Sequence, residues 1–176
     1  MDFAARALPR PELNRAGVLA LACLAMLGFG ALAGGVALAS HPDGSVMQFD
    51  VALLAGSPFP DYFVPGLILG SLFGIGSFVV TIMGLRQFRV APFLAFGIGC
   101  AQMNWIVVEL AIIRELSFLY PTFFAVGLVI ALASAAWGWP VLHAWRRARS
   151  EHSRFIRDRW ARRPVLTFIR ENTARH

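Results

Sequence analysis

The chain has 176 residues, about the length of one domain, but its composition is not that of a soluble domain. Apolar residues make up 57% of the chain and charged residues only 15%, where soluble domains carry about 25% charged residues. The mean hydropathy is +0.63. These values exclude a disordered chain, a coiled coil and a disulfide-stapled secreted module, and they indicate an integral membrane protein.

Four apolar stretches are long enough to cross about 30 Å of hydrocarbon as helices, since a helix rises about 1.5 Å per residue. They cover residues 16–39, 64–85, 90–113 and 122–142, and Glu109 is the one charged side chain inside them. None shows the apolar–polar alternation of a barrel strand. The sequence therefore predicts an all-α fold with a transmembrane domain over residues 1–142, an outer segment at 40–63 and an arginine-rich tail at 143–176.

The arginines predict the direction of the spans. All sixteen basic residues are arginine, and fifteen of them lie before the first span, between the second and third, or after the fourth. Only Arg114 falls on the opposite side. Basic residues favour the cytoplasmic side, so we expect both termini in the cytoplasm. The connections after the second and third spans are short, which predicts an up-down four-helix bundle.

The first span also has features of a secretory signal, because Ala37-Leu38-Ala39 before Ser40 is similar to a cleavage site. Its apolar run is longer than the roughly 7–15 residues of a signal core, so we expect a retained span.

Small residues four apart let spanning helices approach closely. We expect such packing from the row Gly66, Gly70 and Gly74 in the second span and from Gly30 and Gly34 in the first. Two interpretations stay open for the row in the second span, an interface between two copies and packing inside one chain. Near the inner end of the fourth span, Trp137, Trp139 and Trp145 are expected at headgroup depth.

The outer segment is too apolar for a plain loop, and we expect it to fold over the outer end of the bundle. Ser57-Pro58-Phe59-Pro60-Asp61 predicts a rigid turn before the second span.

Three motifs together resemble a known group of proteins: Asp43-Gly44-Ser45, the run from Pro58-Phe59 through Asp61-Tyr62 to Pro65-Gly66-Leu67-Ile68-Leu69, and Trp105-Ile106 with Glu109. The combination is similar to small, uncharacterised four-span bacterial membrane proteins, over about residues 43–131. The resemblance implies the four-span architecture and a bacterial plasma or inner membrane, and it implies no reaction. The arginine-rich tail lies outside it.

The third span carries the polar groups that could form a site. Gln102, Trp105 and Glu109 share one face of a helix, whereas Asn104 points roughly 200° away from Gln102, which predicts a helix surrounded by others. An ionisable group inside a membrane indicates a functional site. We therefore expect Glu109 under the outer segment, either protonated or paired with Arg114 or with groups near Asp61 and Tyr62, where it could relay a proton or hold a cation. In the alternative interpretation Glu109 is structural, and Gln102 and Asn104 form hydrogen bonds between helices.

Patterns for catalysis or cofactors are not found. Cys23 and Cys100 form no C-x-x-C motif, no two histidines face each other within the spans, and no phosphate-binding glycine loop or metalloprotease motif is present. We expect no catalytic residue, no metal and no cofactor.

The tail carries ten arginines and three acidic residues. Its apolar residues recur near helical spacing up to Pro164, which predicts an amphipathic helix on an anionic inner leaflet. The residues expected to contact lipid or a partner protein are Arg154, Arg157, Trp160, Arg162 and Arg163. The tail carries no motif of a nucleic-acid-binding domain, so we expect no nucleic-acid partner.

The function that these patterns favour is that of a non-enzymatic accessory or scaffold subunit of a membrane assembly, either with a membrane-protein partner or as a homo-oligomer. The alternative is a small transporter or a small-molecule or lipid-binding protein with its site around Glu109. A membrane enzyme or redox subunit is a third, weaker hypothesis.

Overall fold

The computed structural model describes residues 10–113 and 118–161, and every regular element in these ranges is helical. The elements are α2 (Arg15–Ser40), η1 (Val51–Leu54), α3 (Phe63–Ile68), η2 (Leu69–Ile75), α4 (Gly76–Leu85), α5 (Ala91–Ile113) and α6 (Leu119–Ala161). Within them, four stretches are long and apolar enough to cross a membrane: Arg15–Ser40, Phe63–Leu85, Ala91–Ile112 and Leu119–Arg147. The prediction of four apolar helices long enough to span a membrane is confirmed, with starts that differ by one to three residues from those expected.

The chain divides into two compact units at Pro140, two residues before the expected end of the transmembrane domain. Residues Arg10–Trp139 belong to one unit, and the described residues from Pro140 onward belong to the other. α6 continues through Pro140 to Ala161 as one helix, so the end of the fourth apolar stretch is not a helix end.

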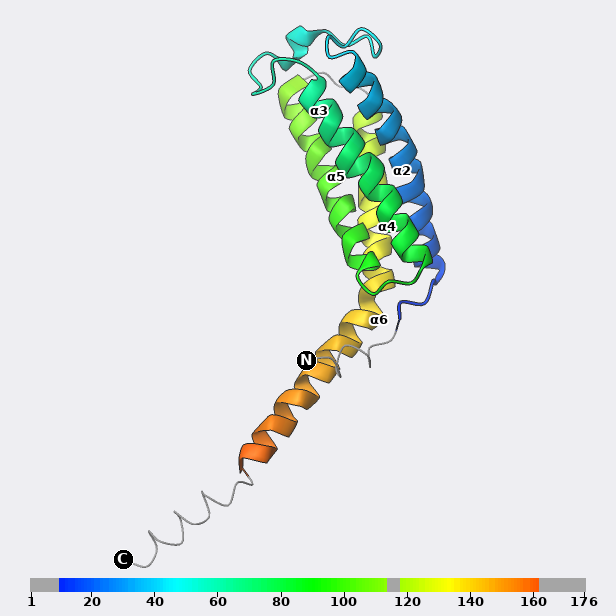
Figure 1. Ribbon diagram of the computed structural model, residues 1–176, viewed down its shortest axis with the longest axis vertical. Helices are drawn as coiled ribbons and strands as arrows, with labels where there is room; N and C mark the ends of the chain where they lie inside the picture. The colour runs from blue at the N-terminus through cyan, green and yellow to red at the C-terminus, as the bar shows by residue number, and fades with distance from the viewer. Residues whose placement is uncertain (1–9, 114–117, 162–176) are drawn as a thin grey trace, which may run out of the picture. The chain divides into compact units, whose positions relative to one another are not determined.

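Within residues 10–139 the segment at 41–62 lies at one end of the bundle and the turn at 86–90 at the other, as Figure 1 shows. Successive helices therefore run in opposite directions. α2 packs along α3, η2 and α4, while α5 packs beside α4.

Capping interactions determine where these helices begin and end. The side chain of Asn14 accepts a hydrogen bond from the backbone N–H of Gly17 at 2.9 Å and so caps α2. At the end of α4, the N–H of Phe88 donates to the carbonyl of Met83 and the N–H of Gln87 to that of Gly84, each at 2.9 Å. This is the Schellman pattern, and Gln87 has φ 54°, in the left-handed region that glycine usually occupies.

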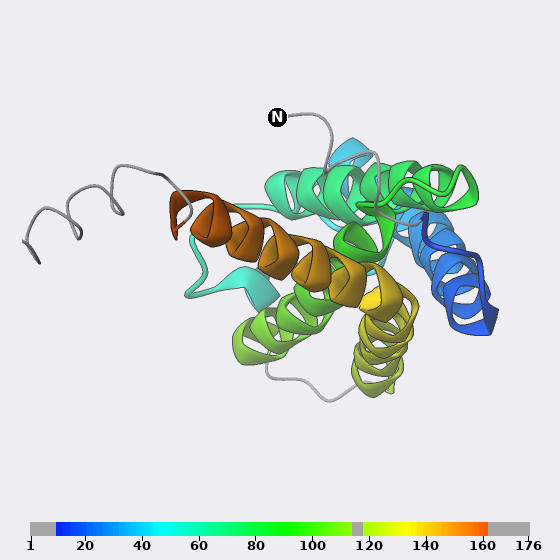
Figure 2. The same cartoon turned by 90° about the horizontal axis from the view of Figure 1, so that it is seen from below.

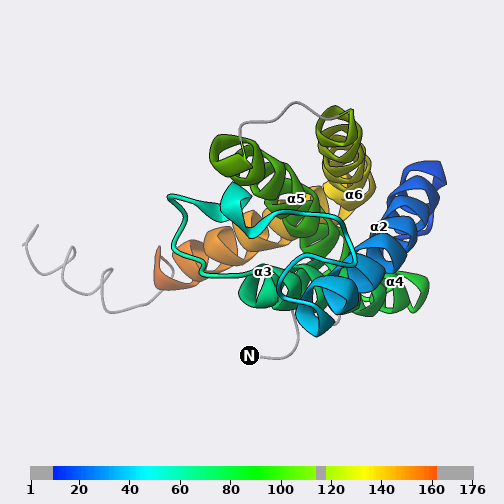
Figure 3. The ribbon, with the colours of Figure 1, turned by 90° about the horizontal axis from the view of Figure 1, so that it is seen from above.

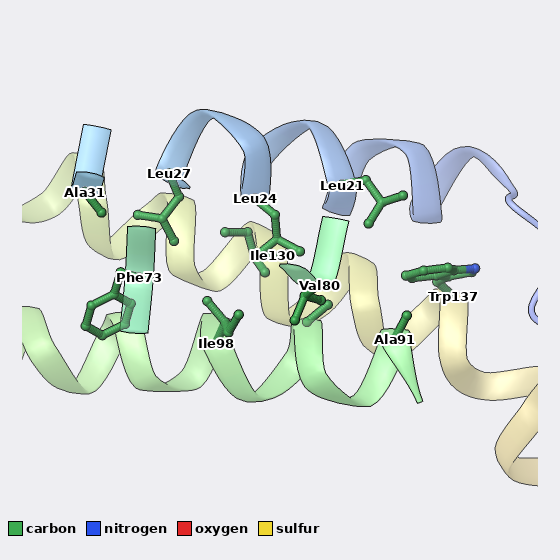
Figure 4. Close-up of a cluster of buried hydrophobic side chains, with 11 residues drawn as sticks. Leu21, Leu24, Leu27, Ala31, Phe73, Val80, Ala91, Ile98, Ile130 and Trp137 are labelled. Atoms are coloured by element: carbon green, nitrogen blue, oxygen red, sulfur yellow. The ribbon is translucent and has the colours of Figure 1, made fainter. Parts of the chain in front are cut away.

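All four spans contribute to one apolar core. α2 supplies Leu21, Leu24, Leu27 and Ala31; the other elements supply Phe73, Val80, Ala91, Ala95, Ile98, Ile130 and Trp137. Figure 4 shows these side chains facing one another between the helices. Burial of this set fixes the faces that each helix turns inward.

Trp137 belongs to that core and not to a belt at headgroup depth, which corrects the expectation from the sequence. Its side chain is 1% exposed, and its indole N–H donates to the backbone carbonyl of Glu12 at 3.1 Å. Gly17 and Gly84 make room for the ring, since a Cβ on either would lie 3.0 Å from it. Trp139 is exposed, as a belt residue would be.

Glycines bring α2 and the second span into backbone contact. A Cβ on Gly66 would lie 2.8 Å from the backbone N of Ala39, and one on Gly74 would lie 3.1 Å from the Cα of Leu32. Gly70 faces Gly35 across the same contact. The row in the second span thus packs inside one chain, which favours the second of the two interpretations given above.

On α2 the glycines in contact are only partly those expected. Gly34 lies against the side chain of Leu69, since a Cβ on Gly34 would lie 3.3 Å from Cδ2 of Leu69. Gly30, in contrast, is exposed, and a Cβ on it would meet nothing within 4 Å. The expected packing role of Gly30 is therefore wrong. Gly28 and Gly35 make the close contacts instead, because they lie two turns apart on the face that meets η2.

The middle of the second span is a π-helix, η2, closed by a hydrogen bond from the N–H of Gly76 to the carbonyl of Ser71. π-helices are rare and often occur at functional sites. This one contains Gly70 and Gly74 together with Phe73, whose ring is 1% exposed. η2 therefore contacts α2 through its glycines and α5 through Phe73.

The segment between α2 and α3 has a small apolar cluster of its own, formed by Leu38, Leu54 and Tyr62. The Tyr62 hydroxyl donates to the carbonyl of Asp50 at 3.0 Å, and its N–H donates to the carbonyl of Pro42, also at 3.0 Å. η1 contacts α5, and Figure 3 shows the segment lying across the ends of the helices. The expected cover over this end of the bundle is present.

Candidate functional site

Trp105 and Glu109 form the polar contact at the centre of the candidate site. They lie one helical turn apart on α5, and the Trp105 indole N–H donates to Oε1 of Glu109 at 2.7 Å. The spacing of four residues brings the two side chains to one face. Both are half-buried, so the carboxyl group lies at an apolar surface with an aromatic donor beside it.

Phe73 holds Trp105 from the neighbouring span. The two ring centroids are 5.8 Å apart and the ring planes meet at 61°, an edge-on arrangement. Phe73 comes from the π-helix η2, which therefore positions the aromatic donor of Glu109. The sequence analysis missed Phe73, because one phenylalanine among fifteen carries no signal of its partner on another helix.

Asp61 and Tyr62, expected beside Glu109, have structural partners of their own. Oδ1 of Asp61 accepts a hydrogen bond from the backbone N–H of Phe63 at 2.9 Å, at the start of α3. Tyr62 is 4% exposed, and its hydroxyl donates to the backbone carbonyl of Asp50. The hydrogen bonds of the described residues therefore join neither of them to Glu109. The other expected partner, Arg114, lies outside the described residues.

Gln102 lies deeper on the same face as Trp105 and is 3% exposed. Its Cγ lies against Gly127 of α6, at 3.2 Å from a Cβ built there. Its Oε1 has no hydrogen-bond partner among the described residues, and the same holds for the hydroxyls of Ser77 and Ser134. Gln102 thus packs between helices, but its carbonyl oxygen makes none of the expected hydrogen bonds within the described chain.

Asn104 points away from this site and is exposed. The prediction that α5 is surrounded by other helices is therefore wrong for a single chain, because the face of α5 that carries Asn104 is open. Gly97, two turns earlier, is also exposed, and a Cβ on it would meet nothing within 4 Å. Asn104 and Glu109 consequently belong to two separate surfaces of α5.

The residues expected to contact lipid lie in or beyond the far part of α6. Arg154 is exposed on this helix, and Arg157 and Trp160 are in its last turns. Arg162 and Arg163 lie outside the described residues, as does Pro164.

Comparison with known proteins finds no family model, no curated protein and no solved structure that matches this chain. The resemblance to small four-span bacterial proteins therefore stays a prediction.

Proposed function

We propose that this chain is a non-enzymatic, multi-pass membrane protein that acts as a scaffold subunit of a membrane assembly, and that its first partner in the assembly is a second copy of itself. The observation that carries the proposal is the exposed amide of Asn104 halfway along an apolar spanning helix.

Asn104 lies near the middle of α5, which runs from Ala91 to Ile113. Its neighbours on the exposed face are apolar, among them Val107 at 55% and Val108 at 43% exposure. In hydrocarbon an unpaired amide costs several kcal/mol, because no water satisfies its N–H and C=O groups. A protein group that pairs with this amide removes that cost.

A second copy supplies such a group at the required depth. A two-fold axis along the membrane normal brings each residue to its own copy at equal depth. The asparagine side chain carries both donors and an acceptor, so two copies of it satisfy each other. Gly97 and Ala101 lie within about 60° of Asn104 around the helix and leave room for the partner's backbone.

The charges favour one orientation for this subunit in the membrane. Arg10, Arg15, Arg86 and Arg89 lie at the end of the bundle where α2 begins, and Asp43, Asp50 and Asp61 lie in the segment at the other end (Figure 1). By the positive-inside rule we infer that the arginine end and both termini are cytoplasmic. The resemblance to small four-span bacterial proteins favours a bacterial plasma or inner membrane. The basic part of α6 then meets an anionic inner leaflet as an amphipathic helix.

Disulfide cross-linking in native membranes tests the proposed contact. In a background with Cys23→Ala and Cys100→Ala, we expect Asn104→Cys to form a dimer on mild oxidation. Met26→Cys is the matched control, because Met26 is 74% exposed in the middle of another spanning helix, α2. Equal cross-linking at the two positions, or none at Asn104→Cys, would contradict the proposal.

A complementary variant measures the energy of the contact. Asn104→Leu removes the amide, and we expect it to weaken the dimer roughly fivefold, since hydrogen bonds between membrane helices are worth about 1 kcal/mol. Asn104→Gln keeps an amide and should retain most of the affinity. Förster transfer between labelled copies in liposomes gives both values.

A second candidate function follows from the Glu109 carboxyl, which uses one oxygen for Trp105 beneath the covered end of the bundle. In this alternative the chain carries a proton or small cation through Glu109. Flux into liposomes that report internal pH tests it: the alternative expects Glu109→Gln to abolish a flux that Glu12→Gln, at an exposed residue, leaves intact. Absence of flux in the unmodified protein would exclude this alternative.

A further inference from the structure

The arginine end of the bundle contains a hollow that the sequence did not indicate. It has a volume of about 400 Å³ and is lined by Arg10, Arg86, Gln87, Phe88, Arg89 and Val90. Arg10 precedes α2, while the other five residues form the turn between α4 and α5, which is 76 residues later in the chain. Figure 2 shows the segment before α2, in blue, beside that green turn.

The lining has the chemistry of an anion site. It contains three arginines and no acidic residue. A guanidinium group offers five donors in a planar fork that matches the oxygens of a phosphate, and it stays charged at any physiological pH. Arg10 and Arg86 are exposed, so their donors are accessible to a ligand from outside the bundle.

The turn that holds these groups is defined by its hydrogen bonds. The Schellman pattern at Gln87 fixes the direction of the chain after α4, and the N–H of Ala91 donates to the carbonyl of Phe88 at 3.1 Å where α5 begins. Gln87 keeps a left-handed conformation with φ 54°, which is costly for a residue with a side chain. Strained backbone of this kind often occurs at binding sites.

Exposed apolar side chains adjoin the arginines. Phe88 is 49% exposed, Val90 51% and Leu85 62%. All three lie at the point where two apolar spans meet their connecting turn. A ligand that places a phosphate on the arginines therefore has an apolar surface beside it for acyl chains.

We propose that this hollow binds the phosphate of an anionic phospholipid headgroup, with Arg10, Arg86 and Arg89 as the charged ligands and the Phe88 ring against the glycerol and the first acyl carbons. The shared chemistry is that of any phosphate ester or free phosphate, and the exposed apolar residues favour the lipid. The site does not depend on the dimer proposed above, because its lining comes from one chain.

Native mass spectrometry of the full chain in neutral detergent tests the proposal, with phosphatidylglycerol and phosphatidylcholine as competing probes. We expect a preference for phosphatidylglycerol that falls about fivefold for each arginine replaced by glutamine in the set Arg10→Gln, Arg86→Gln and Arg89→Gln. The matched control is Arg146→Gln with Arg147→Gln and Arg154→Gln, which removes the same charge from α6.

The outcomes separate the sources of the phosphate. Retained preference in the triple variant at the hollow, or an equal loss in the control, overturns the proposal. Displacement of phosphatidylglycerol by millimolar inorganic phosphate overturns the lipid assignment and assigns a free phosphate. If the triple variant does not fold, the single variant Arg86→Gln decides, because Arg86 lies beyond the end of α4. We expect it to lose about fivefold of the preference for phosphatidylglycerol.

Discussion

Gly35 of α2 lies directly against Gly70 of the π-helix η2: a Cβ built on Gly35 would lie 2.5 Å from both the Cα and the backbone N of Gly70. Real Cβ atoms are essentially never that close to another heavy atom. The atoms that would be met are backbone, so no side-chain rotation relieves the overlap. The contact between these two spans thus depends on the absence of a single methyl group.

We therefore expect Gly35→Ala to destabilise the bundle by about 1–3 kcal/mol, the usual range for overpacking a well-packed contact. Gly30→Ala is the matched control, because it adds the same methyl group on the same helix where nothing lies within 4 Å. Thermal unfolding in detergent, followed by circular dichroism, measures both. Equal stability of the two variants would contradict the close contact.

The rotation of α2 could not be predicted from its sequence, although its length could. α2 is apolar all round, so no polar stripe identifies the side that faces outward. Gly34 and Gly35 are adjacent, and four-residue spacing links Gly30 to Gly34 whereas seven-residue spacing links Gly28 to Gly35. Only the position of the second span decides between the two pairs.

Gly44 and Gly56 offer a second test, now of the segment at 41–62. Both have positive φ, 76° and 89°, but a Cβ on Gly44 would lie 2.2 Å from the carbonyl oxygen of Phe49, whereas one on Gly56 would meet nothing within 4 Å. We expect Gly56→Ala to lower the free energy of unfolding by about 1–2 kcal/mol, the cost of the left-handed backbone conformation alone. Gly44→Ala should cost clearly more and open the segment locally.

Limited proteolysis with chymotrypsin in proteoliposomes measures that opening, since Phe49 lies inside the segment and is 40% exposed. We expect cleavage after Phe49 at least tenfold faster in Gly44→Ala than in Gly56→Ala. Similar rates would show that the turn at Gly44 is not held as described.

The pair Trp105 and Glu109 is tested by a double-mutant cycle. Trp105→Phe removes the donor and Glu109→Leu the acceptor of the 2.7 Å hydrogen bond. We expect the two changes to be non-additive in unfolding free energy by about 0.6 kcal/mol, the average for hydrogen bonds in membrane helices, and by no more than about 1.7 kcal/mol. Glu109→Gln keeps an oxygen that accepts and should retain the coupling. Full additivity would contradict the bond.

The candidate site was predicted only where one helix determines it. Helical spacing alone places Gln102, Trp105 and Glu109 on one face and Asn104 on another, and the structure has this arrangement. Which face turns inward depends on the neighbouring spans, as does the contact of Phe73 with Trp105. The hollow at Arg10 and Arg86 joins residues far apart in the chain, so no local pattern indicates it.

Tyr62 provides a pH-dependent test of the apolar cluster at the covered end of the bundle. Burial, followed by the negative charges of Asp50 and Tyr120, raises the pKa of Tyr62 above the ordinary value for tyrosine. The chain has 2 tyrosines, so Tyr120→Phe leaves Tyr62 as the only phenol. In that variant we expect the ultraviolet absorbance of the phenolate to appear at higher pH in the folded protein than in the unfolded chain.

The direction of the accompanying stability change follows from this shift. A group whose pKa is raised on folding contributes stability in full below its unfolded pKa, and the contribution is lost as the pH rises through the folded pKa. The segment at 41–62 should therefore open only at alkaline pH, above about 10. Tyr62→Phe, which cannot ionise, should remove this alkaline opening while it loses the hydrogen bond to the carbonyl of Asp50. Alkaline opening that persists unchanged in Tyr62→Phe would assign it to another group.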